Sequence, residues 1–174
     1  MNATLEKFAT QCHDYLKAEP GPAGREKVVA ALEGVLKDPA FVTKHVGEGT
    51  GGRDVLYEDP ELGFCILAHA YEGASNSNPH DHGPAWAIYG QASGETEMTE
   101  WEVVEPASED KAGKVRPTKT YALKPGMACL YNEGQLHSPR REDATRLIRI
   151  EGKNMDNVKR LRYEPVAEAD QAVS

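Results

Sequence analysis

Three histidines give the clearest chemical signal in the chain. His80 and His82 are separated by a single residue, and His137 follows much later. Side chains at positions i and i+2 of an extended segment point to the same side, so both imidazoles of the first pair can reach one ion. Pro79 and Pro84 stiffen the ends of this pair. Imidazole suits iron, zinc, copper and nickel, so the sequence predicts one metal ion on His80, His82 and His137.

Two helices and a set of short strands must position these histidines. Apolar residues recur at helical spacing over 4–18 and 23–37, with a Pro-Gly-Pro break between them and Asp38-Pro39 ending the second helix. Downstream, short β-rich segments alternate with Gly, Pro and Asn, which is typical of a sandwich or barrel. Strands are predicted over 42–46, 53–57, 64–71, 85–91, 95–104, 120–123, 128–131 and 145–150, with an exposed loop over 105–118.

Composition limits the classes of protein to consider. A chain of 174 residues with 39% hydrophobic and 28% charged residues fits one globular domain with its own core. A net charge of −8 argues against nucleic acid as a partner. No apolar run suits a membrane span, and no secretory signal is evident, so the expected compartment is the cytoplasm. The scattered residues Cys12, Cys65 and Cys129 form no CxxC pair and are expected to be small buried apolar residues.

The first histidine segment resembles the first motif of the cupin superfamily, G-x5-HxH-x(3,4)-E-x6-G. His80, His82, position 87 and Gly94 fall in step with it, and Gly73 stands one residue early. The glutamate of that motif is replaced by Ala87, which leaves a coordination position free.

The second segment resembles the second cupin motif, G-x5-PxG-x2-H-x3-N. Gly126, Gly134 and His137 are in step, while Asn132 and Arg141 replace the proline and the asparagine. The resemblance implies a mainly β fold, a cupin double-stranded β-helix (jelly-roll barrel) with two N-terminal helices. The expected division is a helical segment over 1–40 that packs on the barrel, the barrel over 41–163, and a flexible tail over 164–174.

Three neutral imidazoles without a carboxylate resemble the cysteine dioxygenase-like family of thiol dioxygenases. That resemblance implies an iron(II) cofactor, with zinc, nickel or manganese as possible substitutes, and it implies a small anionic substrate, dioxygen and a possible homodimer. It also implies that Arg53, at the start of a strand, clamps the substrate carboxylate. The chain departs from the family at Leu147, Arg149 and Glu151, where many members carry serine, histidine and tyrosine.

Strand periodicity places Leu147, Arg149 and Glu151 on one face. If that face is inward, Arg149 is a second candidate anion clamp, and Glu151 pairs with it or orients a ligand. Arg140 and Arg141 are expected at a solvated turn. The remaining candidates are His69 and Tyr71, which are expected to assist the chemistry or support the ligands, and the expected pocket walls Ala87, Tyr89, Trp86 and Tyr131.

Three function classes follow. The first is a mononuclear non-haem iron(II) dioxygenase that oxidises a small carboxylate-bearing thiol or another chelating anion. The alternative is a metal-dependent cupin lyase, isomerase or decarboxylase that does not use dioxygen, in which the metal acts as a Lewis acid. The third is a non-catalytic binding or sensing cupin. Oxygen uptake by iron-loaded protein distinguishes the first, and a barrel packed shut beside the metal would favour the third.

Overall fold

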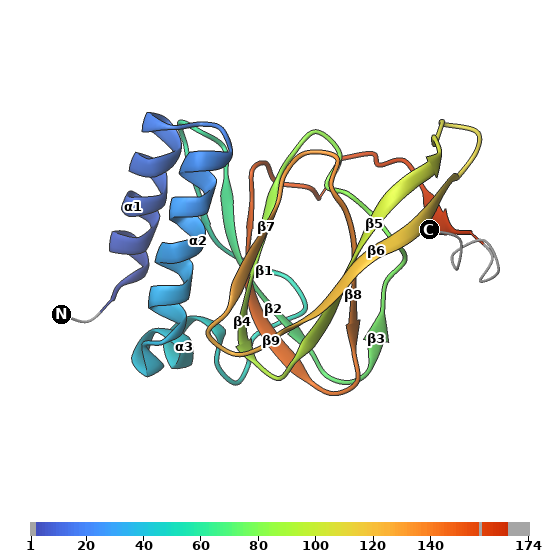
Figure 1. Cartoon of the computed structure of the whole chain (residues 1–174). Coiled ribbons are helices and arrows are strands. Elements are labelled where there is room, and N and C mark those ends of the chain that lie inside the picture. The colour runs from blue at the N-terminus through green and yellow to red at the C-terminus, as the bar shows by residue number, and fades with distance from the viewer. Residues whose placement is uncertain (1–2, 157, 167–174) are drawn as a thin grey trace.

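The computed structural model describes residues 3–156 and 158–166. Its N-terminal part is helical and the rest is a curled β structure (Figure 1). The helices are α1 (Leu5–Ala18), α2 (Pro22–Leu36) and α3 (Pro39–Val46). The strands are β1 (Asp54–Glu58), β2 (Cys65–Tyr71), β3 (Ser75–Asn76), β4 (Ala87–Ser93), β5 (Thr96–Glu105), β6 (Gly113–Leu123), β7 (Ala128–Tyr131), β8 (Leu136–Arg141), β9 (Thr145–Glu151) and β10 (Tyr163–Pro165).

The strands form two five-stranded sheets, in the orders β1-β2-β9-β4-β7 and β10-β6-β5-β8-β3. The chain passes repeatedly from one sheet to the other, and the pairings are antiparallel except for that of β10 with β6. Two sheets connected in this way form a double-stranded β-helix. The jelly-roll barrel predicted from the sequence is therefore confirmed.

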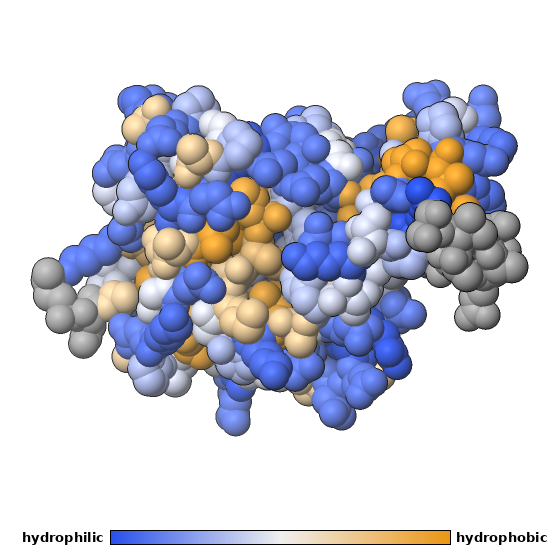
Figure 2. Space-filling view, viewed as in Figure 1, coloured by the Kyte–Doolittle hydropathy of each residue, from blue (hydrophilic) through white to orange (hydrophobic). Residues whose placement is uncertain are grey.

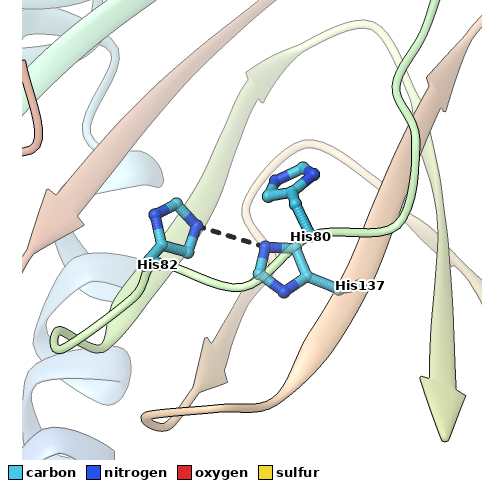
Figure 3. A group of neighbouring side chains, drawn as sticks. All are labelled: His80, His82 and His137. Carbon is cyan, nitrogen blue, oxygen red and sulfur yellow. Dashed lines mark hydrogen bonds between the residues drawn. The ribbon is translucent and has the colours of Figure 1, made fainter. Parts of the chain in front are cut away.

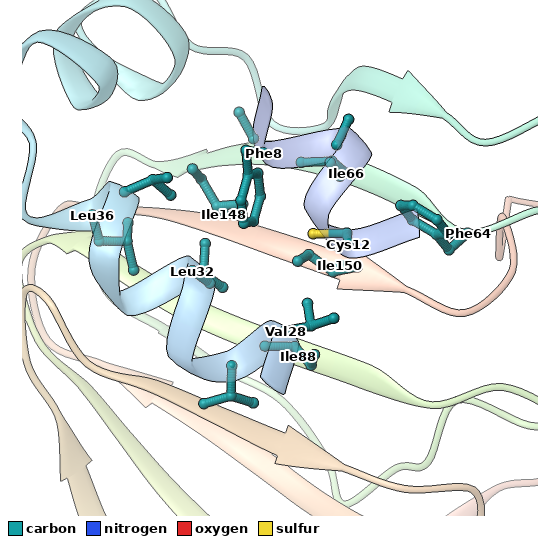
Figure 4. Packing of buried hydrophobic residues seen from close by; sticks show 14 of the residues in the cluster. Phe8, Cys12, Val28, Leu32, Leu36, Phe64, Ile66, Ile88, Ile148 and Ile150 are labelled. Atoms are coloured by element: carbon teal, nitrogen blue, oxygen red, sulfur yellow. The ribbon is translucent and has the colours of Figure 1, made fainter. Parts of the chain in front are cut away.

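The helices cover the outer face of the first sheet (Figure 1). Alternate residues of β2, β4 and β9, such as Ile66, Ile88 and Ile148, pack there against α1 and α2 in one buried cluster (Figure 4). Helix α2 lies so close to β4 that a Cβ atom on Gly90 would stand 2.6 Å from a methyl carbon of Leu32. This packing fixes one wall of the barrel rigidly beneath the site.

The opposite face of the same strands points into the barrel. Its apolar part includes Ala87, Tyr89, Tyr131 and Leu147, together with Met98 from the second sheet. Because successive strand residues alternate between faces, Arg149 and Glu151 share the inward side with Leu147. The sequence predicted one shared face for these three residues and left its direction open; their contacts, described below, show that this face is the inward one.

The predicted strand over 42–46 is wrong, because α3 occupies Pro39–Val46. The carboxylate of Asp38 accepts hydrogen bonds from the backbone N–H groups of Ala40 and Phe41, and Pro39 occupies the first turn. An N-cap followed by proline starts a helix, so Asp38 and Pro39 both end α2 and begin α3. The helical part therefore extends to Val46, beyond the predicted boundary at residue 40.

The predicted loop over 105–118 is also wrong in extent. Strands β5 and β6 continue to Glu105 and from Gly113, forming a long hairpin whose exposed Val103 and Val104 lie in the apolar patch near its tip (Figure 2). Strand β8, which carries His137, was not predicted, and neither were β3 and β10. Strand β10 reaches Pro165, so part of the predicted tail is ordered, and residues 167–174 lie outside the described residues.

Candidate metal centre

Backbone pairing brings the histidine pair to β8. The N–H of His80 donates to the carbonyl of His137 at 3.0 Å, and the N–H of His137 donates back to the carbonyl of His80 at 2.9 Å. This isolated antiparallel bridge fixes the 77–82 loop against the strand that carries the third histidine. Two segments distant in sequence therefore deliver their imidazoles to one place.

The three imidazoles converge as predicted. One ring nitrogen from each of His80, His82 and His137 lies within 4.8 Å of the others (Figure 3). The Nε2 atoms of His82 and His137 are 3.2 Å apart. Two nitrogens at about 2.1 Å from one ion and at right angles to each other would be about 3 Å apart, so this spacing suits a shared metal.

Two of the rings are held in the tautomer that a metal needs. The Nδ1 atom of His80 lies 2.8 Å from the carbonyl of Asn78, and the Nδ1 atom of His137 lies 3.0 Å from the carbonyl of Gln135. A carbonyl can only accept, so Nδ1 carries the hydrogen and the lone pair is on Nε2. Metal-ligating histidines are oriented by such bonds.

The imidazoles are ready to bind without first losing a proton. Burial lowers the pKa of His80 and His82 below the ordinary value, and it lowers the pKa of His137 well below it. Neutral rings are the ligand form. Among the described residues, the only group of metal-ligating side chains found here consists of these three histidines, and Ala87 is fully buried where the cupin motif has glutamate.

Tyr89 and Tyr131 border the cluster, as predicted for pocket walls. The Tyr89 hydroxyl lies 2.9 Å from Nε2 of His82 and 3.0 Å from Nε2 of His137. Burial raises the pKa of Tyr89 to about 12, so its phenol keeps its proton at neutral pH. The Tyr131 ring stacks on His137, with centroids 3.9 Å apart and planes inclined by 10°.

Arg149 places a positive charge inside the barrel, close enough to act on all three histidines. Its guanidinium lies over the Tyr89 ring, 4.7 Å from the centroid, and donates to the hydroxyl of Tyr71 at 3.4 Å. Its Nη1 is 3.6 Å from Oε1 of Glu151. If the neutral histidines held a divalent ion, that ion and Arg149 would together attract anions to this part of the barrel.

Glu151 is bound to Arg53 more directly than to Arg149. Arg53 approaches both carboxylate oxygens of Glu151 at 3.2 and 3.3 Å, and it also bonds to Asn154 and pairs with Asp156 at 2.6 Å. The Arg53 side chain is therefore committed to acidic and amide partners of the protein itself. A substrate carboxylate would have to displace one of them.

His69 and Trp86 have contacts with residues other than the three histidines. Nδ1 of His69 is 2.7 Å from the carbonyl of Gly52, and burial beside Arg149 lowers the pKa of His69 to about 3. Trp86 is part of the cluster beneath the helices, where the guanidinium of Arg25 lies 5.3 Å from its ring. The structure thus separates Trp86 from the histidines, contrary to its predicted role as a pocket wall.

Arg141 was expected at a solvated turn, and this prediction is wrong. It is only 2% exposed, and its guanidinium lies over the Tyr71 ring, 3.9 Å from the centroid. Positions 137, 139 and 141 share one face of β8, so Arg141 points to the same side as His137. Recognising β8 in the sequence would have revealed this.

A groove of about 600 Å³ opens beside the partly buried His80. Its walls include the loop residues Asn78 and Pro79 and the C-terminal residues Arg160 and Arg162. The groove brings solvent, and a basic rim, to one of the three candidate ligands. His80 therefore borders this groove, whereas His82 and His137 are 3% and 0% exposed.

Comparisons with known proteins give a fold likeness only. No protein-family model matches the chain, and neither does any curated protein. A double-stranded β-helix protein from Klebsiella pneumoniae has 15% identity, a TM-score of 0.46, and coverage of 67% of this chain and 82% of that one. KdgF from Halomonas sp. has 15% identity, a TM-score of 0.43, and coverage of 61% and 84%. A cupin superfamily protein from Desulfitobacterium hafniense has 9% identity, a TM-score of 0.41, and coverage of 56% and 72%.

The fold and the site together define a class. The chain is a jelly-roll barrel with a three-histidine cluster that could bind one metal ion. Among the described residues, no helix is both long and apolar enough to cross a membrane.

Proposed function

We propose that this protein is a mononuclear non-haem iron(II) dioxygenase of the three-histidine type. The convergence of three neutral imidazoles, with no carboxylate among the grouped ligand atoms in the described part of the chain, carries the proposal. His80, His82 and His137 would hold the ion through ring nitrogens. Three ligands on one side leave room for a bidentate substrate, and bound iron would supply redox chemistry with dioxygen.

The substrate is proposed to be a small chelating anion that carries a carboxylate, such as a thiol acid. Because no protein carboxylate offsets the ion, an anionic group that binds the ion is favoured electrostatically. Arg149 lies close enough to the cluster to add to the forces that lower the pKa of all three histidines. It is therefore the proposed partner of the substrate carboxylate in place of Arg53.

Tyr89 supplies the protonated hydroxyl nearest to the histidine nitrogens. In this proposal it orients the bound substrate by a hydrogen bond and keeps its own proton at neutral pH. A dioxygenase places both atoms of dioxygen in the product, as when a thiolate becomes a sulfinate. No external reductant is then required.

Oxygen consumption tests the proposal. Iron-loaded full-length protein should consume dioxygen when given cysteine, 3-mercaptopropionate or a chelating diketone, at one dioxygen per product. The His137→Ala variant should show neither tight iron binding nor uptake. Uptake indistinguishable from that of free iron, with every chelating thiol and diketone tried, would contradict the proposal.

A second candidate is a lyase, isomerase or decarboxylase in which the metal acts only as a Lewis acid. The Tyr89 hydroxyl favours it, since a phenol fixed beside the ligand nitrogens is placed for general acid catalysis. Arg149 and Glu151 stand where thiol dioxygenases carry other residues. Turnover without dioxygen, in protein loaded with zinc or manganese, would support this candidate over the first.

A further inference from the structure

Arg141 is a buried cation without an acidic partner. Its guanidinium stacks on the ring of Tyr71. In the described part of the chain it makes no hydrogen bond and no ion pair with another residue. Both Nε and Nη2 are shielded from solvent and unpartnered. Neighbouring Arg140 behaves differently, because it is 55% exposed and lies 3.4 Å from Glu142 and 3.8 Å from Glu97. On the same strand, Arg140 is therefore neutralised by acidic side chains, whereas Arg141 is not.

Arg149 does not neutralise Arg141, and neither does Glu151. Both arginines are cations in contact with Tyr71, and burial together with the charge of Arg149 lowers the pKa of Arg141. Glu151, the acid within 3.6 Å of Arg149, is already bound by Arg53. A buried charge that lacks a partner is costly, so a bound anion is the natural complement.

In the described part of the chain, the hydroxyl groups of Ser75 and Thr145 are also buried and unpartnered. Ser75 is the register partner of Arg141 in the β3–β8 pair, and Thr145 is the register partner of Tyr71 in the β2–β9 pair. Both hydroxyls can donate hydrogen bonds. His69 differs, because its Nδ1 donates to a carbonyl and its free Nε2 offers a lone pair, which does not suit an anion.

The surface opens next to this set of donors. Ser75 and Arg141 line a groove of about 450 Å³, and Tyr71 and Thr145 line a second groove of about 440 Å³. The 450 Å³ groove has room for a small molecule. Glu142 also lies on its wall, but it is paired with Arg140.

We propose that Arg141, assisted by the hydroxyls of Ser75 and Thr145, binds one carboxylate group of a small organic acid. A guanidinium fork matches the two oxygens of a carboxylate, and donors that are already desolvated lose little when the ligand arrives. Phosphate shares this oxyanion chemistry. The carboxylate is preferred because Arg141 offers a single fork with two neutral donors, which suits one negative charge.

The position of Arg141 extends the proposed function. On β8 it follows His137 by four residues, about 13 Å along the strand, and both Arg141 and Arg149 contact Tyr71. Resting on that proposed function, the inference makes the substrate a small dicarboxylate-like anion. One end would lie at the metal and Arg149, and the second carboxylate would lie at Arg141.

Calorimetric titration of succinate into the zinc-loaded full-length chain tests the inference. The comparison uses Arg141→Gln, Arg141→Lys and the matched control Arg140→Gln, with phosphate and chloride as competing probes. Succinate affinity should fall at least tenfold in Arg141→Gln and less in Arg141→Lys. It should stay within about twofold of the parent in Arg140→Gln.

Equal succinate affinity in the parent and in Arg141→Gln would overturn the inference. The absence of detectable binding to the parent, with succinate at millimolar concentration and in 50-fold excess over the protein, would overturn it as well. Phosphate binding as tight as succinate, with the same dependence on Arg141, would overturn the choice of a carboxylate. Zinc content, measured on every sample, separates this result from the metal proposal. Failure of the parent to retain zinc would contradict the proposed metal site. The comparison of succinate affinity between the parent and Arg141→Gln would still be valid.

Thermal unfolding guards against a folding artefact. Without succinate, Arg141→Gln should melt at or above the temperature of the parent, because it removes an uncompensated buried charge. With succinate, the parent should gain more in melting temperature than Arg141→Gln. A variant that melts well below the parent, and gains as much from succinate, would contradict the proposed role.

Discussion

The ring of Tyr131 lies parallel to the imidazole of His137, with the two centroids 3.9 Å apart. The Nδ1 atom of that imidazole is fixed at 3.0 Å from the carbonyl of Gln135. Tyr131 therefore packs on the face of the His137 ring, and the Gln135 carbonyl fixes its edge through Nδ1. The Nε2 atom of His137 lies 3.2 Å from Nε2 of His82 and is held there by protein contacts alone, so the ligand is preorganised.

Replacing Tyr131 should therefore weaken metal binding without removing a ligand. Tyr131→Leu is expected to raise the zinc dissociation constant about tenfold, the lower end of the usual effect of residues that orient ligands. Tyr131→Phe keeps the stacked ring and should stay within about twofold of the parent. Competition with a chromophoric chelator measures both values, and equal weakening by the two variants would show that stacking is not the cause.

Arg53 is expected to act on stability rather than on substrate affinity. The Glu151 side chain is 1% exposed, and Arg53 approaches both of its oxygens. Arg53→Gln leaves that carboxylate buried with Arg149 and the backbone N–H of Met155 as its partners, which should reduce the free energy of unfolding by roughly 3 kcal/mol. Urea denaturation measures the change.

Pairing Arg53→Gln with Glu151→Gln checks the physical reason. If the two side chains act as one unit, the double variant should cost less than the sum of the single changes. Full stability of Arg53→Gln, together with a large rise in KM, would instead restore the role of carboxylate clamp that the sequence resemblance implied.

The Tyr89 hydroxyl should contribute to turnover but not to metal content. Tyr89→Phe is expected to lower kcat by about a hundredfold, within the range for a positioned proton donor, while the bound metal stays at the level of the parent. Tyr57→Phe is a matched control, since the Tyr57 hydroxyl bonds to Asp59 instead. Metal loss in Tyr89→Phe would mean that the phenol supports the ligands rather than the reaction.

Acid should destabilise the protein partly through His69. Burial lowers the pKa of His69 from the ordinary 6.5 to about 3, so the folded state keeps this ring neutral. Between those two pH values the unfolded chain binds a proton that the folded chain does not. Stability therefore falls as the pH decreases from 6.5 toward 3, by up to about 1.4 kcal/mol per pH unit for this one group.

His69→Asn isolates that contribution. The asparagine amide can still donate to the carbonyl of Gly52 but does not titrate. The free energy of unfolding of the variant, followed by denaturation from pH 7.5 to 4.5, should decline less steeply than that of the parent. Identical slopes would show that His69 is not kept neutral by the fold.

Much of the fold was predictable because its signals are local. Helical spacing, Pro-Gly breaks and alternating strands located α1, α2 and most of the barrel, and the spacing of the motifs identified His80, His82 and His137. Helix α3 was missed because Asp38 reads equally well as the end of one helix and as the cap of the next. Strand β8 was missed because Pro139 and two arginines resemble a turn.

Which side chains meet inside the barrel depends on the register of strand pairing. A single sequence gives little information about that register. Arg141 and Tyr71 are seventy residues apart, yet their side chains stack at 3.9 Å from the ring centroid. The partner of Arg53 depends on how the chain beyond β9 folds back, since Asn154 and Asp156 belong to that segment. Pairwise contacts of this kind follow from the closed barrel rather than from residue type or spacing.

X-ray absorption spectroscopy of the iron-loaded full-length chain tests the central claim most directly. We expect one iron per chain, with three imidazole nitrogens at about 2.1 Å and exchangeable oxygen ligands completing the shell. A shell with one imidazole or none, in protein that holds stoichiometric iron, would contradict the assignment of His80, His82 and His137 as the metal ligands.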